Sequence, residues 1–200
     1  MPKLVILDLG GVLYNIDFDK TKRALMELRG YNGCDVAFGV ETQSDVFVQY
    51  DRGDLTTVEF RDELRSMYGF TCTDAEIDRA WCAILDNGLF PFAPDVVHSI
   101  RLRSASGPAD RLVIFSNISE LHYLDAKDRC SPVFSLVDDV YLSYTLRLRK
   151  PDPLSFLAIC EKEGMLPSQA TLIDDSLANC TAAKHLGMTT IHVIDPYALL

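Results

Sequence analysis

Reactive polar side chains directly follow three short apolar runs of the sequence: Asp8, then Ser116 with Asn117, then Asp174 with Asp175. One cation, Lys150, stands in a polar stretch directly before a proline. Carboxylates, a cation, a hydroxyl and an amide are together able to hold a divalent metal beside a phosphoryl group. Oxygen ligands of this kind suit Mg²⁺, which binds one or two carboxylates together with substrate phosphate.

Each of these residues also has a structural explanation when it is taken alone. An aspartate after a strand is usually a turn or capping residue, and Ser116-Asn117 is an ordinary turn pair. Asp152 precedes Pro153, a pattern typical of a helix N-cap, so we expect it to be structural. The adjacent acids 174 and 175 repel each other, and a buried pair of this kind requires a nearby cation. The co-occurrence of all these groups in order favours a functional site.

The elements that must position these groups are strands buried on both faces. The apolar runs are short and do not alternate with polar residues, which is typical of strands in a parallel sheet. They cover residues 4–7, 111–115, 170–173 and 189–194. Helical patterns at 153–163 and 177–186 separate the later ones, so the sequence predicts a doubly wound α/β fold. Ligands bind beyond the carboxyl ends of the strands of such a sheet.

About a hundred residues separate the first strand from the strand at 111, far more than one crossover helix needs. Helices are predicted there over residues 19–29, 35–50, 56–68 and 73–86, with a further helix near 94–103. The interval therefore predicts a helical subdomain inserted after the first strand. We expect an α/β core of residues 1–14 plus 92–200 and a helical cap of residues 15–91.

Composition excludes several classes of protein. The 200-residue chain has a net charge of -10, whereas a nucleic-acid binder shows a basic patch or stripe. No apolar stretch reaches the length of a membrane span, and the first apolar run is too short for a signal peptide. The six cysteines show no Cys-x-x-Cys pair or zinc spacing. We therefore expect a cytoplasmic protein with reduced thiols and a small-molecule partner.

The order of the motifs resembles the haloacid dehalogenase (HAD) superfamily over nearly the whole chain. The first motif matches Asp8-Leu9-Gly10-Gly11-Val12-Leu13, and the others match Ser116-Asn117, Lys150-Pro151 and Asp174-Asp175. The long helical insertion is similar to the helical cap of this superfamily. A bacterial subgroup that includes a glucose-1-phosphate phosphatase also reads Asp-Leu-Gly at the first motif. The likeness to it extends into residues 14–18 and 50–53, and a sugar phosphate is accordingly one expected substrate.

The resemblance implies a role for each residue of the site. Asp8 would attack phosphorus and form an aspartyl-phosphate that water hydrolyses. Mg²⁺ would be bound by Asp8, the Gly10 backbone carbonyl and the acidic pair, with Asp175 favoured over Asp174 as the direct ligand. Ser116 and the Asn117 backbone would bind phosphate oxygens, and Lys150 would neutralise charge. The implied activity is Mg²⁺-dependent hydrolysis of a small soluble phosphomonoester.

One position departs from the superfamily's phosphatases, which carry a second aspartate two residues after the nucleophile. Gly10 stands there, so the metal-binding carbonyl is kept but the general acid/base is lost, a loss that typically slows a reaction by about 10²–10⁴-fold. Two alternatives stay open: a metal-free haloacid dehalogenase, whose halide leaves unprotonated, and a catalytically weak phosphate-binding or regulatory protein. The acidic pair at 174 and 175 argues against the dehalogenase.

Two residues are candidates for replacing the missing general acid, and a third is a candidate for substrate recognition. Asp17 lies a few residues after the nucleophile and is alternatively the N-cap of the following helix. His122 lies one turn into the helix after Ser116, and a histidine titrates near neutral pH. Arg52, in the expected cap, is a candidate for recognising an anionic substrate, although a surface ion pair explains it as well. A leaving group of low pKa would lessen the need for an acid.

Overall fold

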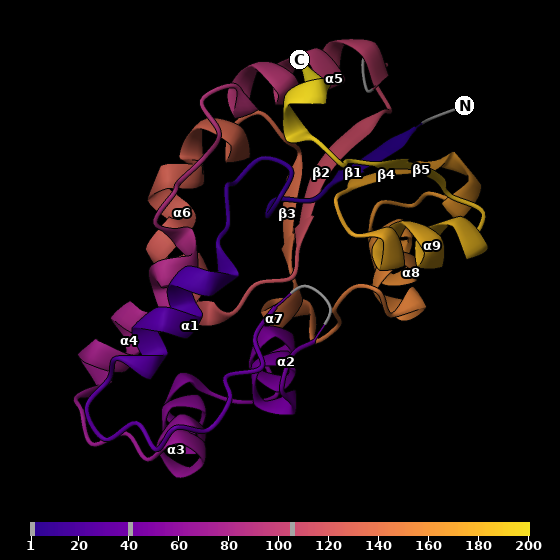
Figure 1. Cartoon of the computed structure of the whole chain (residues 1–200). Helices are drawn as coiled ribbons and strands as arrows, with labels where there is room; N and C mark the ends of the chain where they lie inside the picture. Colours follow the sequence, from indigo (N-terminus) through magenta and orange to yellow (C-terminus); the bar gives the residue numbers. More distant parts are fainter. Residues whose placement is uncertain (1–2, 40–41, 105–106) are drawn as a thin grey trace.

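The computed structural model describes residues 3–39, 42–104 and 107–200 of the chain (Figure 1). Within these ranges, five parallel strands form one sheet in the spatial order β3-β2-β1-β4-β5. The strands are β1 (Leu4–Leu7), β2 (Arg111–Ser116), β3 (Asp139–Leu142), β4 (Ala170–Asp174) and β5 (Thr189–His192). The four strands predicted from apolar runs are all present, and the prediction of a parallel sheet is confirmed. The run 189–194 is the exception to the predicted burial on both faces, because β5 ends at His192 and lies mostly exposed at the edge of the sheet.

Apolar side chains fill both faces of this sheet. Successive strand residues point to opposite faces, so Leu7 belongs to one buried cluster and Ile6 to the other. The Leu7 face packs against α5 (Ala93–Ser104) and α6 (Glu120–Phe134), whereas the Ile6 face packs against α8 (Pro153–Lys162) and α9 (Leu177–His185). Figure 1 shows these helix pairs on the two sides of the sheet. The predicted doubly wound arrangement is confirmed.

The edge strand β3 was not predicted from the sequence. It begins with the exposed Asp139, and only its last two residues, Tyr141 and Leu142, are buried. Because half of the strand lies at the solvated edge, it has no continuous apolar run. The short helix α7 (Ser143–Leu146) follows it directly, and this helix was not predicted either.

Helices fill the long interval between β1 and β2, as the sequence predicts. They are α1 (Phe18–Met26), α2 (Asp45–Arg52), α3 (Thr57–Tyr68) and α4 (Asp74–Cys82), followed by a 3₁₀ turn at Ala83–Leu85. Trp81 joins them, because its ring stacks on Phe47 at a centroid distance of 5.1 Å and lies 4.9 Å from the ring of Phe60. The division into a core and a cap of residues 15–91 stays a prediction.

The helix predicted over residues 35–50 begins too early. The described residues 35–39 and 42–44 form extended and bent chain, and α2 starts only after Ser44. Residues 40 and 41 lie outside the described ranges. The ring of Phe38 packs 5.0 Å from those of Phe18 and Phe47. This tertiary packing of Phe38 outweighs the local helical pattern.

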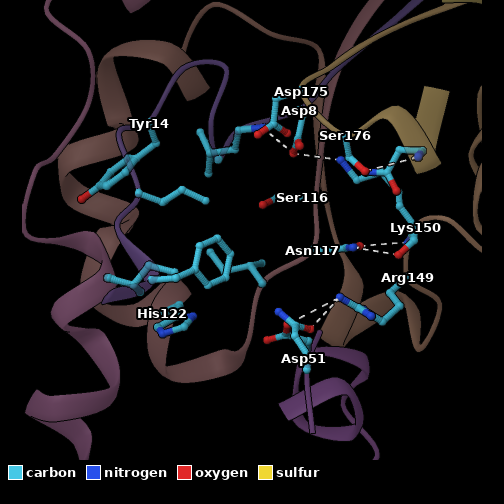
Figure 2. A pocket seen from close by; sticks show the side chains of 18 of the residues that line it. Asp8, Tyr14, Asp51, Ser116, Asn117, His122, Arg149, Lys150, Asp175 and Ser176 are labelled. Atoms are coloured by element: carbon cyan, nitrogen blue, oxygen red, sulfur yellow. Dashed lines mark hydrogen bonds and ion pairs between the residues drawn. The ribbon is translucent and has the colours of Figure 1, made fainter. Parts of the chain in front are cut away.

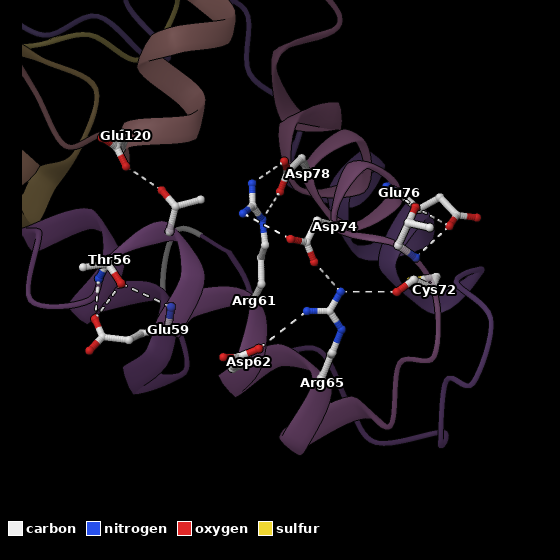
Figure 3. A network of polar contacts seen from close by, with 12 residues as sticks. Thr56, Glu59, Arg61, Asp62, Arg65, Cys72, Asp74, Glu76, Asp78 and Glu120 are labelled. Atoms are coloured by element: carbon white, nitrogen blue, oxygen red, sulfur yellow. Dashed lines mark hydrogen bonds and ion pairs between the residues drawn. The ribbon is translucent and has the colours of Figure 1, made fainter.

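Polar contacts fix α3 and α4 at their ends (Figure 3). Both helices begin with a capping box, formed by Thr56 with Glu59 and by Thr73 with Glu76. Between the helices, Arg61 donates to Asp78 at 2.6 Å. Thr57 at the start of α3 donates to Glu120 of α6 at 2.5 Å, and this contact ties the inserted helices to the rest of the domain.

None of the helices in the described ranges is both long enough and apolar enough to cross a membrane.

Candidate active site

Three carboxylates meet at the carboxyl edge of the sheet. Asp8 directly follows β1, and the parallel register of β1 and β4 brings it level with Asp174, the residue before Asp175. One carboxylate oxygen from each residue lies within 4.8 Å of the others. Carboxylate oxygens at this spacing suit a hard divalent cation such as Mg²⁺. The structure thus brings together the three acids that the sequence predicts to converge.

Lys150 inserts its ammonium group between two of these acids. Its Nζ donates to Asp8 Oδ1 at 2.8 Å, to Asp174 Oδ2 at 2.7 Å and to the Phe115 carbonyl at 2.9 Å. The side chain is 1% exposed. Burial acts to lower the pKa of Lys150, but the adjacent carboxylates outweigh it and raise this pKa above the usual value. Lys150 is therefore a cation at neutral pH.

A single ammonium group does not neutralise three carboxylates. Burial raises the pKa of Asp8 to about 8, and repulsion from Asp174 and Asp175 adds to that effect, although Lys150 opposes it. Burial and then repulsion from Asp174 likewise raise the pKa of Asp175. A divalent cation would reverse both effects by favouring the ionised forms. The charge of the cluster therefore fits a bound metal.

The two adjacent acids have different surroundings. Asp174 is fully buried, and its oxygens accept from Lys150 Nζ, the Ser176 backbone N–H at 2.9 Å and Asn179 Nδ2 at 2.9 Å. Asp175 instead lies against Gly11, where an added Cβ would stand 2.0 Å from its Oδ2. The Asp175 carboxylate therefore lies at the first-motif loop, whereas the carboxylate of Asp174 is saturated by protein donors.

Ser116 and Asn117 lie at the end of β2, on the same edge of the sheet. Both line the cavity that contains Asp8, and Ser116 is 4% exposed. The side chain of Asn117 is already engaged: its Nδ2 donates to the Lys150 carbonyl at 2.8 Å, and its Oδ1 accepts from the Lys150 N–H at 2.9 Å. Asn117 therefore positions the Lys150 backbone.

The cavity around Asp8 has a volume of about 470 Å³, which is within the range for small-molecule sites. Figure 2 shows Asp8 and Asp175 on one side of it and Asp51 on the other. The walls between them are largely apolar and come from both the strand loops and the inserted helices. They include Ile16, Phe18, Phe38, Val48, Ile84, Leu85 and Ile118.

The space beside Gly10 is filled by an aliphatic side chain. A Cβ added at Gly10 would lie 3.2 Å from Cδ1 of Ile16. Ile16 thus stands where the side chain of a residue at position 10 would begin. The carbonyl of Gly10 accepts no hydrogen bond from the described part of the chain.

Two of the candidate residues from the sequence lie outside the cavity lining. Asp17 caps α1 by accepting from the backbone N–H groups of Asp19 at 3.0 Å and Lys20 at 3.3 Å. Arg52 is 44% exposed in its side chain and pairs with Asp54. The structure agrees with the alternative explanation for each residue: Asp17 is a helix cap, and Arg52 forms a surface ion pair. Neither residue lies at Asp8.

His122 lines the cavity, but its ring proton is engaged elsewhere. The ring stacks on Trp81 at 4.5 Å, and Nε2 lies 3.0 Å from the Trp81 carbonyl, to which it donates. Burial lowers the pKa of His122 to about 4, so the ring is neutral at pH 7. Its single proton is then held by a backbone oxygen, which argues against His122 as the general acid.

Asp51 and Arg149 also line the cavity, although the sequence did not indicate them as site residues. Asp51 is 6% exposed, and Arg149 Nη2 lies 4.0 Å from its Oδ2. Burial raises the pKa of Asp51 to about 6, although the charge of Arg149 opposes the shift. The only indications in the sequence are that Arg149 precedes Lys150 and that Asp51 lies in the segment 50–53.

Comparison with known proteins agrees with this geometry. The haloacid dehalogenase-like hydrolase family matches residues 2–187. The D-ribitol-5-phosphate phosphatase of Bacteroides thetaiotaomicron is 29% identical over 198 residues, which cover 95% of this chain and 91% of that protein.

Two solved structures are also similar. A HAD-family enzyme from B. thetaiotaomicron, crystallised with magnesium and inorganic phosphate, has a TM-score of 0.78 and 29% identity, covering 96% of this chain and 94% of the other. The L-2-haloacid dehalogenase of Xanthobacter autotrophicus with covalently bound chloropropionic acid has a TM-score of 0.60 and 18% identity, covering 96% and 78%. The dehalogenase shares the fold alone. With the family match over residues 2–187 and the motif residues gathered at one sheet edge, the chain belongs to the haloacid dehalogenase-like hydrolases.

Proposed function

We propose that this hydrolase is a Mg²⁺-dependent phosphatase that acts on a small phosphomonoester and uses Asp8 as its nucleophile. The observation that carries the proposal is the position of Asp8. Its carboxylate lies 2.8 Å from the Lys150 ammonium and within 4.8 Å of the acidic pair, at one side of a cavity large enough for an organic phosphate.

The donor set fits Mg²⁺. Asp8 and Asp175 offer carboxylate oxygens, and the Gly10 carbonyl accepts no hydrogen bond from the described chain. Asp174 is saturated by three donors, so it supports the site by holding Lys150 and the start of α9. When bound, the metal neutralises phosphate charge and favours the ionised form of Asp8. The relative crystallised with magnesium and phosphate supports this assignment.

The nucleophilic step uses the ionised carboxylate of Asp8. One of its oxygens bonds to phosphorus as the ester P–O bond breaks, and the leaving oxygen takes the electron pair and then a proton. Water next attacks phosphorus, and the bond between phosphorus and the Asp8 oxygen breaks. Inorganic phosphate leaves, a proton of the water passes to phosphate or solvent, and the ionised carboxylate of Asp8 is restored. The Lys150 ammonium, the Ser116 hydroxyl and the Asn117 backbone N–H stabilise the charge that develops on the phosphoryl oxygens.

The source of the leaving-group proton distinguishes this site from that of other phosphatases of the superfamily. Gly10 has no carboxylate, Asp17 caps α1, and the His122 proton is donated to Trp81. None of these three residues supplies the proton, so we propose solvent as the donor for the alkoxide, and protonation by Asp51 is the competing assignment that the experiment of the next subsection distinguishes. This arrangement favours substrates whose leaving groups are weak bases or are bound tightly enough to offset the missing acid.

The substrate is a sugar or polyol phosphate. The D-ribitol-5-phosphate phosphatase that covers 95% of this chain supports that class. The segment 15–91 acts as the cap, because it supplies Ile16, Phe38, Val48 and Asp51 to the walls of the cavity. A cytoplasmic location stays a prediction.

The test is hydrolysis of an aryl phosphate by three samples: the enzyme with Mg²⁺, the enzyme with EDTA, and Asp8→Asn with Mg²⁺. We expect activity only in the first. Release of halide from a haloacid in EDTA would instead identify the dehalogenase. Tight phosphate binding without turnover across a broad phosphomonoester panel would identify the non-enzymatic alternative.

A further inference from the structure

Asp51 is a buried carboxylate without a hydrogen-bond donor of its own. It is 6% exposed and lines the cavity, yet neither of its side-chain oxygens accepts a hydrogen bond within the described ranges. Arg149 comes nearest, with Nη2 at 4.0 Å, but this nitrogen donates to Gln43 Oε1 at 3.2 Å. Neither Asp51 oxygen is among the fully buried polar atoms without a partner in the described ranges, so the carboxylate is open to the cavity that it lines. A ligand in the cavity can therefore donate a hydrogen bond to it.

Asp174 provides the contrast within the same molecule. That carboxylate is also buried, but it accepts from one ammonium, one amide and one backbone N–H. Buried carboxylates are usually hydrogen-bonded in this way. Asp51 accepts no such bond in the described ranges, although it lines the same cavity as Asp8.

The backbone holds Asp51 firmly in place. Ser143 Oγ donates to the Asp51 carbonyl at 2.5 Å. Two residues later, Gly53 ends α2 with a φ of 78°, and its Cα lies so close to α7 that an added Cβ would stand 2.2 Å from the Tyr144 carbonyl oxygen. The carboxylate is thus presented to the cavity by a fixed element, as a specificity group requires.

The chemistry of the position selects the ligand group. Asp51 offers an acceptor, and Arg149 offers donors beside it, including an Nε–H without an acceptor in the described ranges. A hydroxyl group both donates and accepts, so it suits this pair. A second anionic group would be repelled by Asp51, and an ammonium group would be repelled by Arg149.

We propose that Asp51 recognises the leaving group of the substrate by accepting a hydrogen bond from one of its hydroxyls, with Arg149 as its positioning partner. Figure 2 shows Asp51 across the cavity from Asp8, with Asn117 between them. A phosphoryl group held at Asp8 therefore directs its ester substituent toward Asp51. This inference rests on the proposed phosphatase function and names the residue that selects polyol phosphates.

The test compares kcat/KM for two substrates whose leaving groups contain the same number of carbons: a pentitol phosphate and the corresponding unsubstituted alkyl phosphate. Asp51→Asn and Asp51→Leu are measured beside Asp45→Asn, which changes an exposed acid on the same helix. A hydrogen bond to a charged group contributes about 1.5–3 kcal/mol. We therefore expect the pentitol-to-alkyl ratio to fall roughly 10- to 100-fold in Asp51→Leu and less in Asp51→Asn, and to stay constant in Asp45→Asn.

Two results would overturn the inference. An unchanged pentitol-to-alkyl ratio in Asp51→Leu, in a variant whose thermal unfolding matches wild type, removes Asp51 from hydroxyl recognition. Equal losses for both substrates relative to an aryl phosphate assign Asp51 to protonation of the leaving group instead. Hydrolysis of the aryl phosphate by the wild-type enzyme with Mg²⁺ tests the proposed function separately. No hydrolysis would refute the phosphatase function. Hydrolysis with an unchanged pentitol-to-alkyl ratio in Asp51→Leu would refute only the role of Asp51.

Discussion

The Cδ1 atom of Ile16 stands 3.2 Å from the point where a Cβ on Gly10 would lie. The backbone of Gly10 does not have the positive φ found at the neighbouring Gly11. The main chain at position 10 therefore accepts a Cβ, and among the described residues the tight contact of that Cβ is with the flexible tip of Ile16. The aspartate that this chain lacks at position 10 can therefore be introduced there by mutation.

Gly10→Asp combined with Ile16→Ala supplies both a carboxylate and the space for it. If the lack of a general acid limits turnover, kcat for an alkyl phosphate should rise by about 100-fold, the low end of what a positioned acid contributes. Hydrolysis of an aryl phosphate, whose leaving group needs little protonation, should rise far less. The comparison is made at saturating Mg²⁺, with Ile16→Ala alone as the control. Equal changes for the two substrates would contradict the assignment.

Lys150→Met removes the only cation that contacts Asp8 or Asp174 in the described ranges. Because Asp174 is fully buried, it is then left as an uncompensated charge, and we expect a loss of about 3–5 kcal/mol in the free energy of unfolding. Urea denaturation monitored by circular dichroism measures this loss. Lys162→Met, at the exposed end of α8, is the matched control and should change stability little. A Lys150 variant as stable as the control would show that the buried pairs do not contribute as described.

Gly11→Ala should weaken metal binding. The new Cβ would overlap Asp175 Oδ2 at 2.0 Å, so the carboxylate must move away from the first-motif loop. Gly164→Ala introduces a side chain at a similar φ of 66° but meets nothing within 4 Å, so it controls for backbone strain. Titration of activity with Mg²⁺ should give a half-saturating concentration about 10- to 100-fold higher for Gly11→Ala only, because disturbing the orientation of a metal ligand typically costs that much in metal affinity. Equal half-saturation in both variants would argue against Asp175 as a ligand.

His122 should make the protein less stable in acid. Burial depresses its pKa to about 4, against 6.5 for the ordinary side chain. Between these values the unfolded chain binds a proton that the native state does not, so stability falls as the pH is lowered through this window. The full shift corresponds to about 3 kcal/mol. Asp51 acts in the opposite direction: its raised pKa of about 6 makes stability fall as the pH rises from about 4 to 6.

The contribution of His122 is isolated by comparing wild type with His122→Gln from pH 7.5 to 4. The variant loses the stacking on Trp81 and should be less stable at pH 7.5. Its deficit in the free energy of unfolding should shrink as the pH falls, because glutamine does not titrate. A deficit independent of pH in His122→Gln would contradict the burial of a neutral ring.

The sequence predicted the sheet well because central strands carry a local pattern. Runs such as Leu4–Leu7 are apolar at every position, and two buried faces explain this. The edge strand β3 begins with the exposed Asp139 and has only two buried residues, so it gives no such pattern. The other edge strand, β5, is also exposed, and it was predicted only because its residues are β-branched and apolar. The early start predicted for α2 has another cause: Phe38 is held between two other rings, a contact that no local pattern reveals.

The same distinction applies to the site. Asp8, Ser116 and Asp174 follow strands, and parallel strands end at a shared edge, so their convergence was predictable. Asp51 was not predictable as a site residue, because its environment is built by Arg149 and Ser143, both far away in the sequence. Its neighbour Arg52 carries the more conspicuous charge but pairs with Asp54 at the surface. The two neighbours differ in burial, because Asp51 is buried and Arg52 is exposed. Their positions in the sequence do not reveal this difference.

The most direct measurement is chemical trapping of the acyl phosphate during turnover. The enzyme is mixed with an aryl phosphate and Mg²⁺, quenched, and treated with borohydride, which reduces an aspartyl-phosphate to homoserine. Mass spectrometry of the peptide that contains β1 should show homoserine at position 8, with Asp174 and Asp175 unmodified and no reduction when Mg²⁺ is chelated. Continued release of phosphate with Asp8 unreduced, or by the Asp8→Asn variant, would contradict the assignment of Asp8 as the nucleophile.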